Sequence, residues 1–228
     1  MGSFKDVVGH KDIIQYIQNA VTEDKVSHAY ILNGERGAGK KLLAALFAET
    51  LLCEEKGPEP CGKCHSCIQA ESGNHPDIIR VTHEKPGSIS VDDIREQVNQ
   101  TVAVKPYQGA YKVYIIPEAD LMTVQAQNAL LKTIEEPPEH VVFILATTEF
   151  NKIPATIVSR CQRFDFRRIS NDAIVSRLSY IADCEGIRFE PDALSRIAKA
   201  AAGGMRDAVS LLELCAGGAA DVNEDRVA

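Results

Sequence analysis

The sequence predicts an α/β fold, in which helices cover both faces of a parallel sheet, followed by a small all-helical domain. Short apolar runs alternate with helical patterns, and a glycine-rich motif joins the first run to the helix that follows it. After residue 168 only helical patterns remain. The expected strands are 29–32, 78–81, 112–116 and 141–146, and the expected helices between them are 41–52, 91–103 and 124–135.

The limits of several elements can be predicted from single residues. A helix is expected over 12–21, where apolar residues recur at helical spacing. Ser90 is expected to cap the helix over 91–103, because acidic residues fill the turn after it. Pro137 and Pro138 end the helix over 124–135. The sheet domain is expected to span 1–168.

The remaining residues, 169–228, are expected to form a small helical domain without strands. Asn171 opens its first helix, Pro191 opens its second, and the pair Gly203–Gly204 precedes its third.

Composition excludes several classes of protein. The chain has 228 residues, 45% of them apolar, which is enough for one large and one small domain. Its formal net charge of −7 disfavours a free-standing, nonspecific DNA-binding protein, although it leaves room for a local basic patch. No apolar window is long enough to span a membrane, and no targeting signal is evident. We therefore expect a cytoplasmic protein.

The glycine-rich motif at 34–41 is close to a phosphate-binding P-loop, whose pattern is G-x-x-x-x-G-K-[ST]. Gly34, Gly37 and Gly39 allow backbone N–H groups to cradle a phosphate, and Lys40 supplies the cation. Lys41, however, stands where the pattern requires a hydroxyl that binds Mg²⁺. A glycine-rich turn without a ligand is the alternative.

The second half of a P-loop site shows a matching departure. An acidic pair is expected after the strand over 112–116, but Pro117 takes the metal-binding position while Glu118 keeps the water-activating one. Asp120 is the alternative metal ligand, although it lies two residues beyond the expected position. Two lost ligand types on one ion argue against ordinary Mg²⁺-assisted hydrolysis.

Four cysteines have the spacing of a structural zinc site: Cys53, Cys61, Cys64 and Cys67. Four sulfur ligands close the coordination sphere of Zn²⁺ and leave no position for catalysis. Disulfides, an iron–sulfur cluster, or His65 in place of one cysteine are the alternatives. The other cysteines, Cys161, Cys184 and Cys215, are isolated and are expected to be buried free thiols.

Taken together, these motifs resemble the clamp-loader branch of the AAA+ family over nearly the whole chain. The similar segments are His28–Tyr30 with the P-loop, the four-cysteine insert, 128–138, 145–148, 157–161 and 203–207. The resemblance implies that Arg160, in a Ser-Arg-Cys motif, reaches the ATP site of a neighbouring subunit. It also implies sensor roles for Thr148 and Arg206, and adenine packing at 8–10.

Within this branch, Lys41 and Pro117 favour a delta-prime subunit, catalytically weak or inactive, that can bind ATP or ADP without hydrolysis. The resemblance then implies gamma/tau and delta subunits as partners, and the sliding clamp and primed DNA through the complex. A gamma/tau-type motor that uses Glu118 is the first alternative, and a nucleotide-independent scaffold is the second. The collar-forming third domain of the family has no counterpart within these residues.

Overall fold

The computed structural model describes residues 2–216 and 221–222, and these residues form two compact units. The first unit comprises Lys11–Gly34 and Lys40–Asp165, with the N-terminal segment up to Asp6. The second comprises Val7–His10, Glu35–Gly39 and the chain from Phe166 onward. The P-loop therefore contributes residues to both units, and each unit is described by itself.

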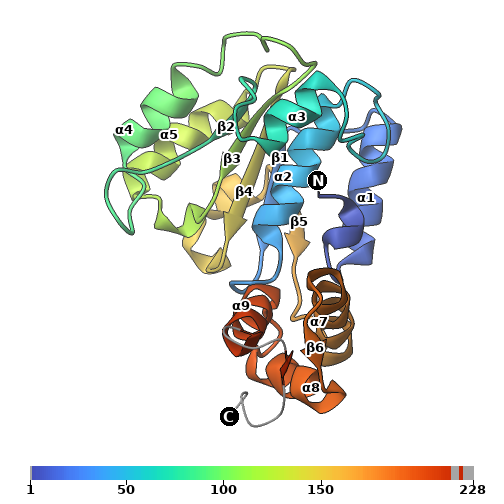
Figure 1. Ribbon diagram of the computed structural model, residues 1–228. Coiled ribbons are helices and arrows are strands. Elements are labelled where there is room, and N and C mark those ends of the chain that lie inside the picture. The colour runs from blue at the N-terminus through green and yellow to red at the C-terminus, as the bar shows by residue number, and fades with distance from the viewer. Residues whose placement is uncertain (1, 217–220, 223–228) are drawn as a thin grey trace. The chain divides into compact units, whose positions relative to one another are not determined.

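The first unit is built on a five-stranded parallel sheet with the order β2-β3-β4-β1-β5 (Figure 1). Its strands are β1 (Ala29–Asn33), β2 (Ile78–Arg80), β3 (Lys112–Ile116), β4 (Val141–Thr147) and β5 (Gln162–Asp165). All neighbouring strands pair in parallel, so their carboxyl ends meet at one edge of the sheet. Strand β4, which lies between β1 and β3, is buried along its whole length. Such two-sided burial explains why the central strands are continuous apolar runs.

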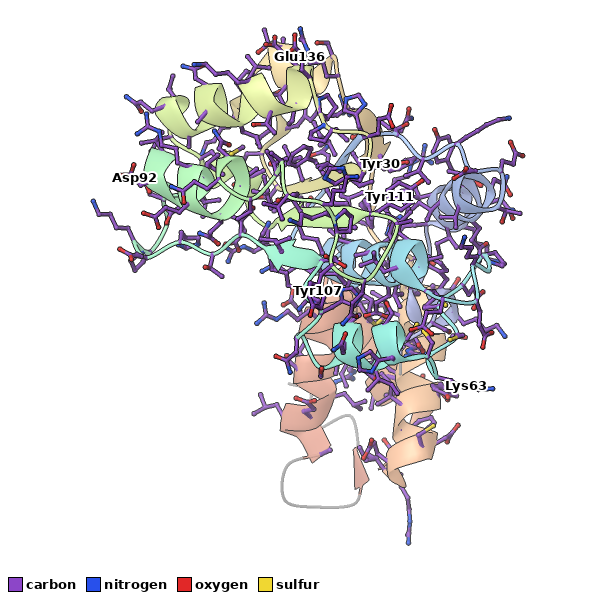
Figure 2. The ribbon with its side chains drawn as sticks, turned by 90° about the horizontal axis from the view of Figure 1, so that it is seen from above. Tyr30, Lys63, Asp92, Tyr107, Tyr111 and Glu136 are labelled. Carbon is purple, nitrogen blue, oxygen red and sulfur yellow. The ribbon has the colours of Figure 1, made fainter. Side chains whose placement is uncertain are left out.

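Helices cover both faces of this sheet, as the sequence predicts. Their bounds are α1 (Lys11–Thr22), α2 (Lys40–Leu52), α3 (His65–Glu71), α4 (Val91–Ile94), α5 (Val124–Glu135) and α6 (Ala155–Val158). On one face Ile31 and Phe143 join a core cluster with residues of α4, α5 and α6. On the other, the ring of Tyr30 packs edge-on against Phe47 of α2 at 4.9 Å between centroids (Figure 2).

One predicted helix is shorter than expected. Ser90 caps α4 as predicted, in a capping box with Asp93. The helix ends at Ile94, however, and continues as a π-helical turn over Arg95–Asn99 rather than as regular helix to residue 103. The sequence analysis also missed α3, which begins in the cysteine-rich insert, and the edge strand β5, whose alternating burial has only one fully buried residue, Phe164.

The second unit is mainly helical, with α7 (Asn171–Glu185), α8 (Pro191–Ala200) and α9 (Met205–Ala216). Its core gathers apolar residues of all three helices, including Leu178, Ile197 and Leu212. The expectation that this part has no strands was wrong: β6 (Arg188–Phe189) and β7 (Asp221–Val222) form a short parallel pair. Two-residue strands carry no periodicity that a sequence reading could detect. In neither unit does a described helix have the length and apolarity needed to cross a bilayer.

Candidate functional site

The P-loop lysine lies at the start of a helix, as its motif predicts. Gly34 follows β1, and its N–H donates to the carbonyl of Thr147 at the end of β4 (3.2 Å). Lys40 begins α2, is only 8% exposed, and donates from Nζ to the carbonyl of Gly34. Strand, loop and helix therefore follow one another as a P-loop requires.

The middle of the P-loop packs within the second unit. Gly37 and Gly39 both have positive φ, +78° and +91°, which explains why glycine occupies these positions. The carbonyl of Gly37 accepts a hydrogen bond from the N–H of Met205 (3.1 Å), and a Cβ at Gly37 would lie 3.1 Å from Cα of Gly204. Met205 is the first residue of α9, so the exposed Arg206 lies next to the loop.

Two further groups lie against the same loop segment. Arg168 donates to both carboxylate oxygens of Glu35 at 2.9–3.1 Å, which holds one P-loop side chain in an exposed ion pair. The ring of His10 packs 4.5 Å from that of Phe166. Burial lowers the pKa of His10, and a hydrogen bond with the backbone of Ala38 offsets only part of this effect. Its Nε2 is buried and has no partner among the described residues. Arg168 and His10 thus hold the segment from Glu35 to Ala38 within the second unit.

Lys41, which departs from the P-loop pattern, faces Glu118, which keeps the expected carboxylate, within the first unit. Nζ of Lys41, in the first turn of α2, lies 3.8 Å from Oε1 of Glu118. Glu118 follows Pro117 at the end of β3 and has the left-handed φ of +60°, which is rare for a residue other than glycine. The ion pair thus joins the two positions where a P-loop enzyme places its metal-ligating hydroxyl and its catalytic carboxylate.

These residues do not fit the magnesium ion that the P-loop motif implies. Mg²⁺ is bound through oxygen ligands, usually one or two carboxylates and the substrate phosphates. Here an ammonium group replaces the hydroxyl at Lys41 and a proline ring replaces the carboxylate at Pro117. Neither of the two protein ligands that a P-loop provides for Mg²⁺ is present at this position.

Asp120, the alternative metal ligand, is already engaged in a network that the sequence analysis missed. Its Oδ1 accepts from the hydroxyl of Thr147 (2.7 Å) and from the N–H of Thr148 (3.0 Å). Burial raises the pKa of Asp120, but these hydrogen bonds outweigh burial and leave the pKa below its usual value. Thr148 itself is exposed, just beyond β4. In the sequence, the signal for this network is the pair of hydroxyl residues, Thr147 and Thr148, at the end of the apolar run over 141–146.

Arg160 lies two residues beyond α6 and is exposed. Its guanidinium donates to the carbonyl of Thr156 (2.8 Å) and forms an ion pair with Glu135 at the end of α5 (2.9 Å). The contact with Thr156 lies four residues back, so the side chain is folded over its own helix. The charge of the predicted arginine finger is therefore held by oxygen atoms of its own unit.

The four predicted zinc ligands lie together. Their sulfur atoms are all within 4.8 Å of one another, and those of Cys61 and Cys67 are 4.0 Å apart. Zn–S bonds of about 2.3 Å in a tetrahedron place sulfurs about 3.8 Å apart, whereas a disulfide needs about 2.05 Å. The spacing of the cluster fits Zn²⁺, its four thiols are free rather than joined in disulfides, and His65 is not part of it.

Local structure brings the four sulfurs into place. Cys53 follows α2 directly, and Cys64 caps α3 by accepting from the N–H of Cys67. N–H groups of Lys63 and Cys64 point at the sulfur of Cys61 and lower the pKa of its thiol to about 7, which favours the thiolate that a metal requires. In contrast, burial raises the pKa of Cys53 and Cys67.

The expectation that the three isolated cysteines are buried holds only in part. Cys215 is buried, and burial raises the pKa of Cys161 to about 12. Cys184 is exposed on α7, so that part of the prediction was wrong. A single cysteine on an amphipathic helix carries no signal that fixes its face.

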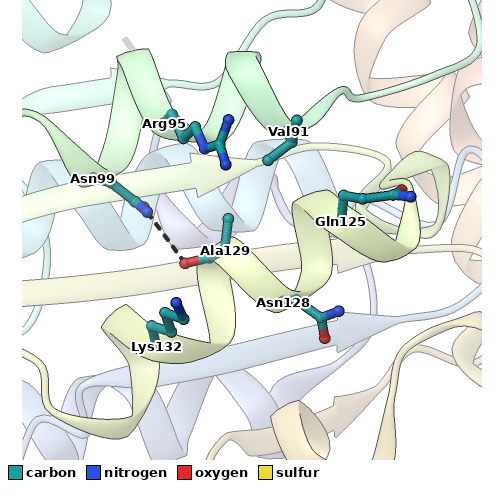
Figure 3. Close-up of a pocket in the computed structure, with 7 residues that line it drawn as sticks. All are labelled: Val91, Arg95, Asn99, Gln125, Asn128, Ala129 and Lys132. Carbon is teal, nitrogen blue, oxygen red and sulfur yellow. Dashed lines mark hydrogen bonds between the residues drawn. The ribbon is translucent and has the colours of Figure 1, made fainter.

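A hollow of ≈ 270 Å³ with a mostly apolar lining surface lies between α4, the π-helical turn and α5 (Figure 3). It is lined by Val91, Arg95, Asn99, Gln125, Asn128, Ala129 and Lys132. Asn99 donates to the carbonyl of Ala129 (3.2 Å), and Arg95 forms an exposed ion pair with Asp92 (3.4 Å). Sequence reasoning missed this hollow because its residues come from two separate helical segments.

Comparison with protein families identifies both parts of the chain. Residues 9–170 match the family described as DNA polymerase III, delta subunit. Residues 173–214 match the family described as DNA polymerase III clamp loader subunit, ATPase lid domain.

Similar proteins with curated names are gamma and tau subunits. The chain is 48% identical over 211 residues to DNA polymerase III subunit tau of Bacillus subtilis, covering 92% of this chain and 37% of that protein. It is 40% identical over 212 residues to subunit tau of Escherichia coli, covering 92% and 32%. The chain thus spans roughly a third of the length of these relatives.

Solved structures show the same fold at low identity. A RuvB mutant of Thermotoga maritima has a TM-score of 0.67 at 17% identity, covering 98% of this chain and 69% of that one. A DNA polymerase III gamma subunit-related protein of the same organism has a TM-score of 0.55 at 20% identity, covering 89% and 71%. The two family matches, together with the similarity to tau subunits, establish that the chain belongs to the DNA polymerase III clamp-loader family.

Proposed function

We propose that this chain acts in DNA replication as a clamp-loader subunit of the gamma/tau type. In this role it works with delta and further clamp-loader subunits to load the sliding clamp onto primed DNA in the cytoplasm. The similarity to named tau subunits at 40–48% identity favours this assignment over the delta-prime subunit, which the sequence motifs alone favoured. That preference for delta-prime rested on only two positions, Lys41 and Pro117.

One observation carries the proposal: Arg160 is exposed beyond α6 and is held only by surface contacts. A guanidinium supplied to a neighbouring subunit stabilises the charge that spreads over a phosphoryl group during its transfer. Because the arginine comes from another subunit, hydrolysis is coupled to assembly. Contacts of this exposed kind contribute little energy, so Arg160 can exchange them for a phosphate.

The chain's own nucleotide site is proposed to hold ATP or ADP with slow turnover. Lys40 and the glycines of the P-loop would hold the phosphates, while Thr148 and Arg206 would sense the terminal one. The departures at Lys41 and Pro117 favour slow turnover, because they remove both protein ligands of the Mg²⁺ ion that assists hydrolysis. Zn²⁺ bound by the four cysteines would have a structural role only.

A delta-prime subunit is the second candidate, and the departures at Lys41 and Pro117 favour it. Both candidates use Arg160 in trans and differ in what their own site does. A motor of the gamma/tau type would hydrolyse ATP and lose turnover on Glu118→Gln. A delta-prime subunit would show no turnover of its own, and a pure scaffold would bind no nucleotide at all.

Two basic residues beside the hollow between α4 and α5, Arg95 and Lys132, are proposed to contact primed DNA. Arg95 and Lys132 would contact backbone phosphates there without reading the sequence. Within an assembly, a few local cations can bind DNA phosphates even though the chain as a whole has a net charge of −7. Arg95→Ala with Lys132→Ala should then weaken DNA-stimulated turnover and reduce its salt dependence, whereas turnover without DNA stays unchanged.

The experiment that tests the proposal is reconstitution of the clamp loader from the full-length protein and its partner subunits. Clamp- and DNA-dependent ATP turnover is measured for the wild type, Arg160→Ala and Lys40→Ala. Loss of turnover with Arg160→Ala supports donation in trans. Failure of the protein to enter the complex, or full turnover without Arg160, would contradict the proposal.

A further inference from the structure

We propose that the nucleotide site of this chain binds the polyphosphate without a divalent cation, with the ammonium group of Lys41 in the place of the metal. The inference rests on the proposed binding of ATP or ADP, and it goes further by naming the ligand species: free nucleotide rather than its magnesium complex. It follows from the mismatch between the P-loop motif and the residues at the metal position.

The first step concerns where Lys41 lies. In a P-loop the residue after the lysine stands in the first turn of the helix and turns its hydroxyl toward the metal. Lys41 occupies this position in α2, and its Nζ lies 3.8 Å from Oε1 of Glu118 at the end of β3. The ammonium therefore lies between the helix start and the strand end, where a P-loop enzyme holds Mg²⁺.

The second step concerns the charge available to the phosphates. Lys40 is buried at the loop and provides one positive charge. Lys41 provides a second charge on a side chain that is 71% exposed, so it can move from Glu118 to an incoming phosphate. The two ammonium groups together carry a charge of +2, whereas one lysine and one Mg²⁺ ion would carry +3. The second ammonium group thus replaces part of the positive charge that a metal would bring to the phosphates.

The third step concerns the residues that would otherwise hold the metal. Pro117 has no side-chain oxygen. Asp120 is bound to Thr147 and Thr148, and its carboxylate would have to leave both to reach an ion. Among the described residues at this strand end, Glu118 is the carboxylate nearest the P-loop helix, and it already faces Lys41. A divalent cation at this position would lie beside the positive charge of Lys41, and the repulsion between the two charges would disfavour its binding.

The test is a titration of the full-length protein with ATP by calorimetry, once in excess EDTA and once in excess magnesium chloride. We expect the wild type to bind ATP in EDTA at least as tightly as in magnesium. Lys41→Thr should weaken binding in EDTA about tenfold or more, because a charge-assisted contact with phosphate is lost. The matched control, Lys105→Ala on an exposed loop, should leave binding unchanged.

A gain-of-function variant sharpens the test. Lys41→Thr combined with Pro117→Asp restores both ligand types, and we expect its ATP binding to become at least about tenfold tighter with magnesium than in EDTA. Should this variant not fold, the comparison of EDTA and magnesium on the wild type still decides the question. Wild-type binding that requires magnesium would overturn the inference and leave the proposed function intact. Absence of ATP binding in both conditions would also overturn it, while donation of Arg160 is tested separately by the reconstituted complex.

Discussion

At the scale of single residues, the availability of the Arg160 guanidinium depends on its ion pair with Glu135. Glu135 neutralises its guanidinium at 2.9 Å, and the carbonyl of Thr156 draws the side chain back over its own helix. In this geometry the guanidinium is engaged within its own unit, and the proposed donation to a partner's ATP would require a stronger anion to replace Glu135. Because both side chains are about 40% exposed, the ion pair costs at most about 1 kcal/mol to break.

We therefore predict that Glu135→Gln leaves trans-stimulated ATP turnover unchanged or raises it by up to about fivefold, the factor that corresponds to 1 kcal/mol. The neighbouring Glu136→Gln, which is equally exposed, is the matched control and should have no effect. Steady-state turnover of the reconstituted complex measures the difference. A clear loss of turnover with Glu135→Gln would mean that Glu135 aims the arginine rather than withholding it.

A buried histidine makes stability depend on pH. His75 is 4% exposed, its Nδ1 accepts from the N–H of Asp77 (3.1 Å), and its Nε2 contacts the hydroxyl of Ser66 (2.9 Å). Burial lowers its pKa from 6.5, against the opposing charge of Asp77. As the pH falls, the imidazole of His75 is therefore protonated in the unfolded chain before it is protonated in the folded one. The contribution of His75 to the free energy of unfolding is thus present above pH 6.5 and is lost as the pH falls below it.

The matched variant is His75→Asn, whose side-chain oxygen can accept from the same N–H but does not titrate. We expect the wild type to lose free energy of unfolding more steeply than this variant as the pH falls below 6.5. Urea unfolding across this range measures both slopes. Equal slopes would show that His75 does not contribute to the pH dependence.

At the scale of elements, the four-cysteine insert joins the end of α2 to the start of α3. A metal bound there would tie the two helices together through covalent ligands, and its removal would leave four neighbouring thiols without a centre. We predict that chelation lowers the melting temperature by several degrees, since each kcal/mol corresponds to about 2–4 °C in a chain of this size.

Two cysteine variants separate this effect from general loss of thiols. Cys64→Ser should reproduce the chelated state, because it removes one ligand at the start of α3. Cys184→Ser, on an exposed position of α7, should keep the wild-type melting temperature and its response to the chelator. A melting temperature that does not change on chelation would refute the structural role of the metal.

The short helix α4 depends on its cap. Ser90 accepts from the N–H of Asp93 (3.1 Å), and the carboxylate of Asp93 accepts from the N–H of Ser90 (2.7 Å). A four-residue helix has few other means to satisfy these groups, so Ser90→Ala should lower the free energy of unfolding by about 1 kcal/mol. Ser88→Ala, two residues earlier, is the control in urea unfolding. An equal loss in both variants would contradict the capping role.

The same elements show how far a sequence predicts structure. Strands β3 and β4 and helix α5 were predicted to within a residue, because long apolar runs and proline leave no competing pattern. The π-helical turn after Ile94 was not predicted, because its hydrogen-bond register depends on packing against α5 rather than on local residue types. The cysteine site was predicted because ligand spacing is local.

At the scale of the whole molecule, the functional residues come from distant parts of the sequence. Sequence motifs located Lys41, Glu118 and Arg160, but not that Lys41 faces Glu118 or that Arg160 faces Glu135. Those pairings depend on parallel strands that end at one edge of the sheet and on helices that end near one another. The hydrogen bonds of Asp120 and the hollow between α4 and α5 were not predicted either, because they also join residues from separate elements.

The choice between clamp-loader types also belongs to this scale. Two substituted positions suggested delta-prime, whereas identity over 92% of the chain favours gamma/tau. A few residues of a site can change what the site does without changing the branch to which the whole chain is similar. We therefore propose a gamma/tau-type subunit that contributes chiefly through Arg160.

The most direct measurement is ATP turnover of the reconstituted clamp loader, with the sliding clamp and primed DNA, for the wild type and Arg160→Ala. Arg163→Ala, an exposed arginine three residues away on β5, is the control. We predict that Arg160→Ala lowers turnover at the site that receives the arginine by about 10³-fold or more, whereas Arg163→Ala does not. Wild-type turnover by Arg160→Ala, in a complex that assembles normally, would contradict the account.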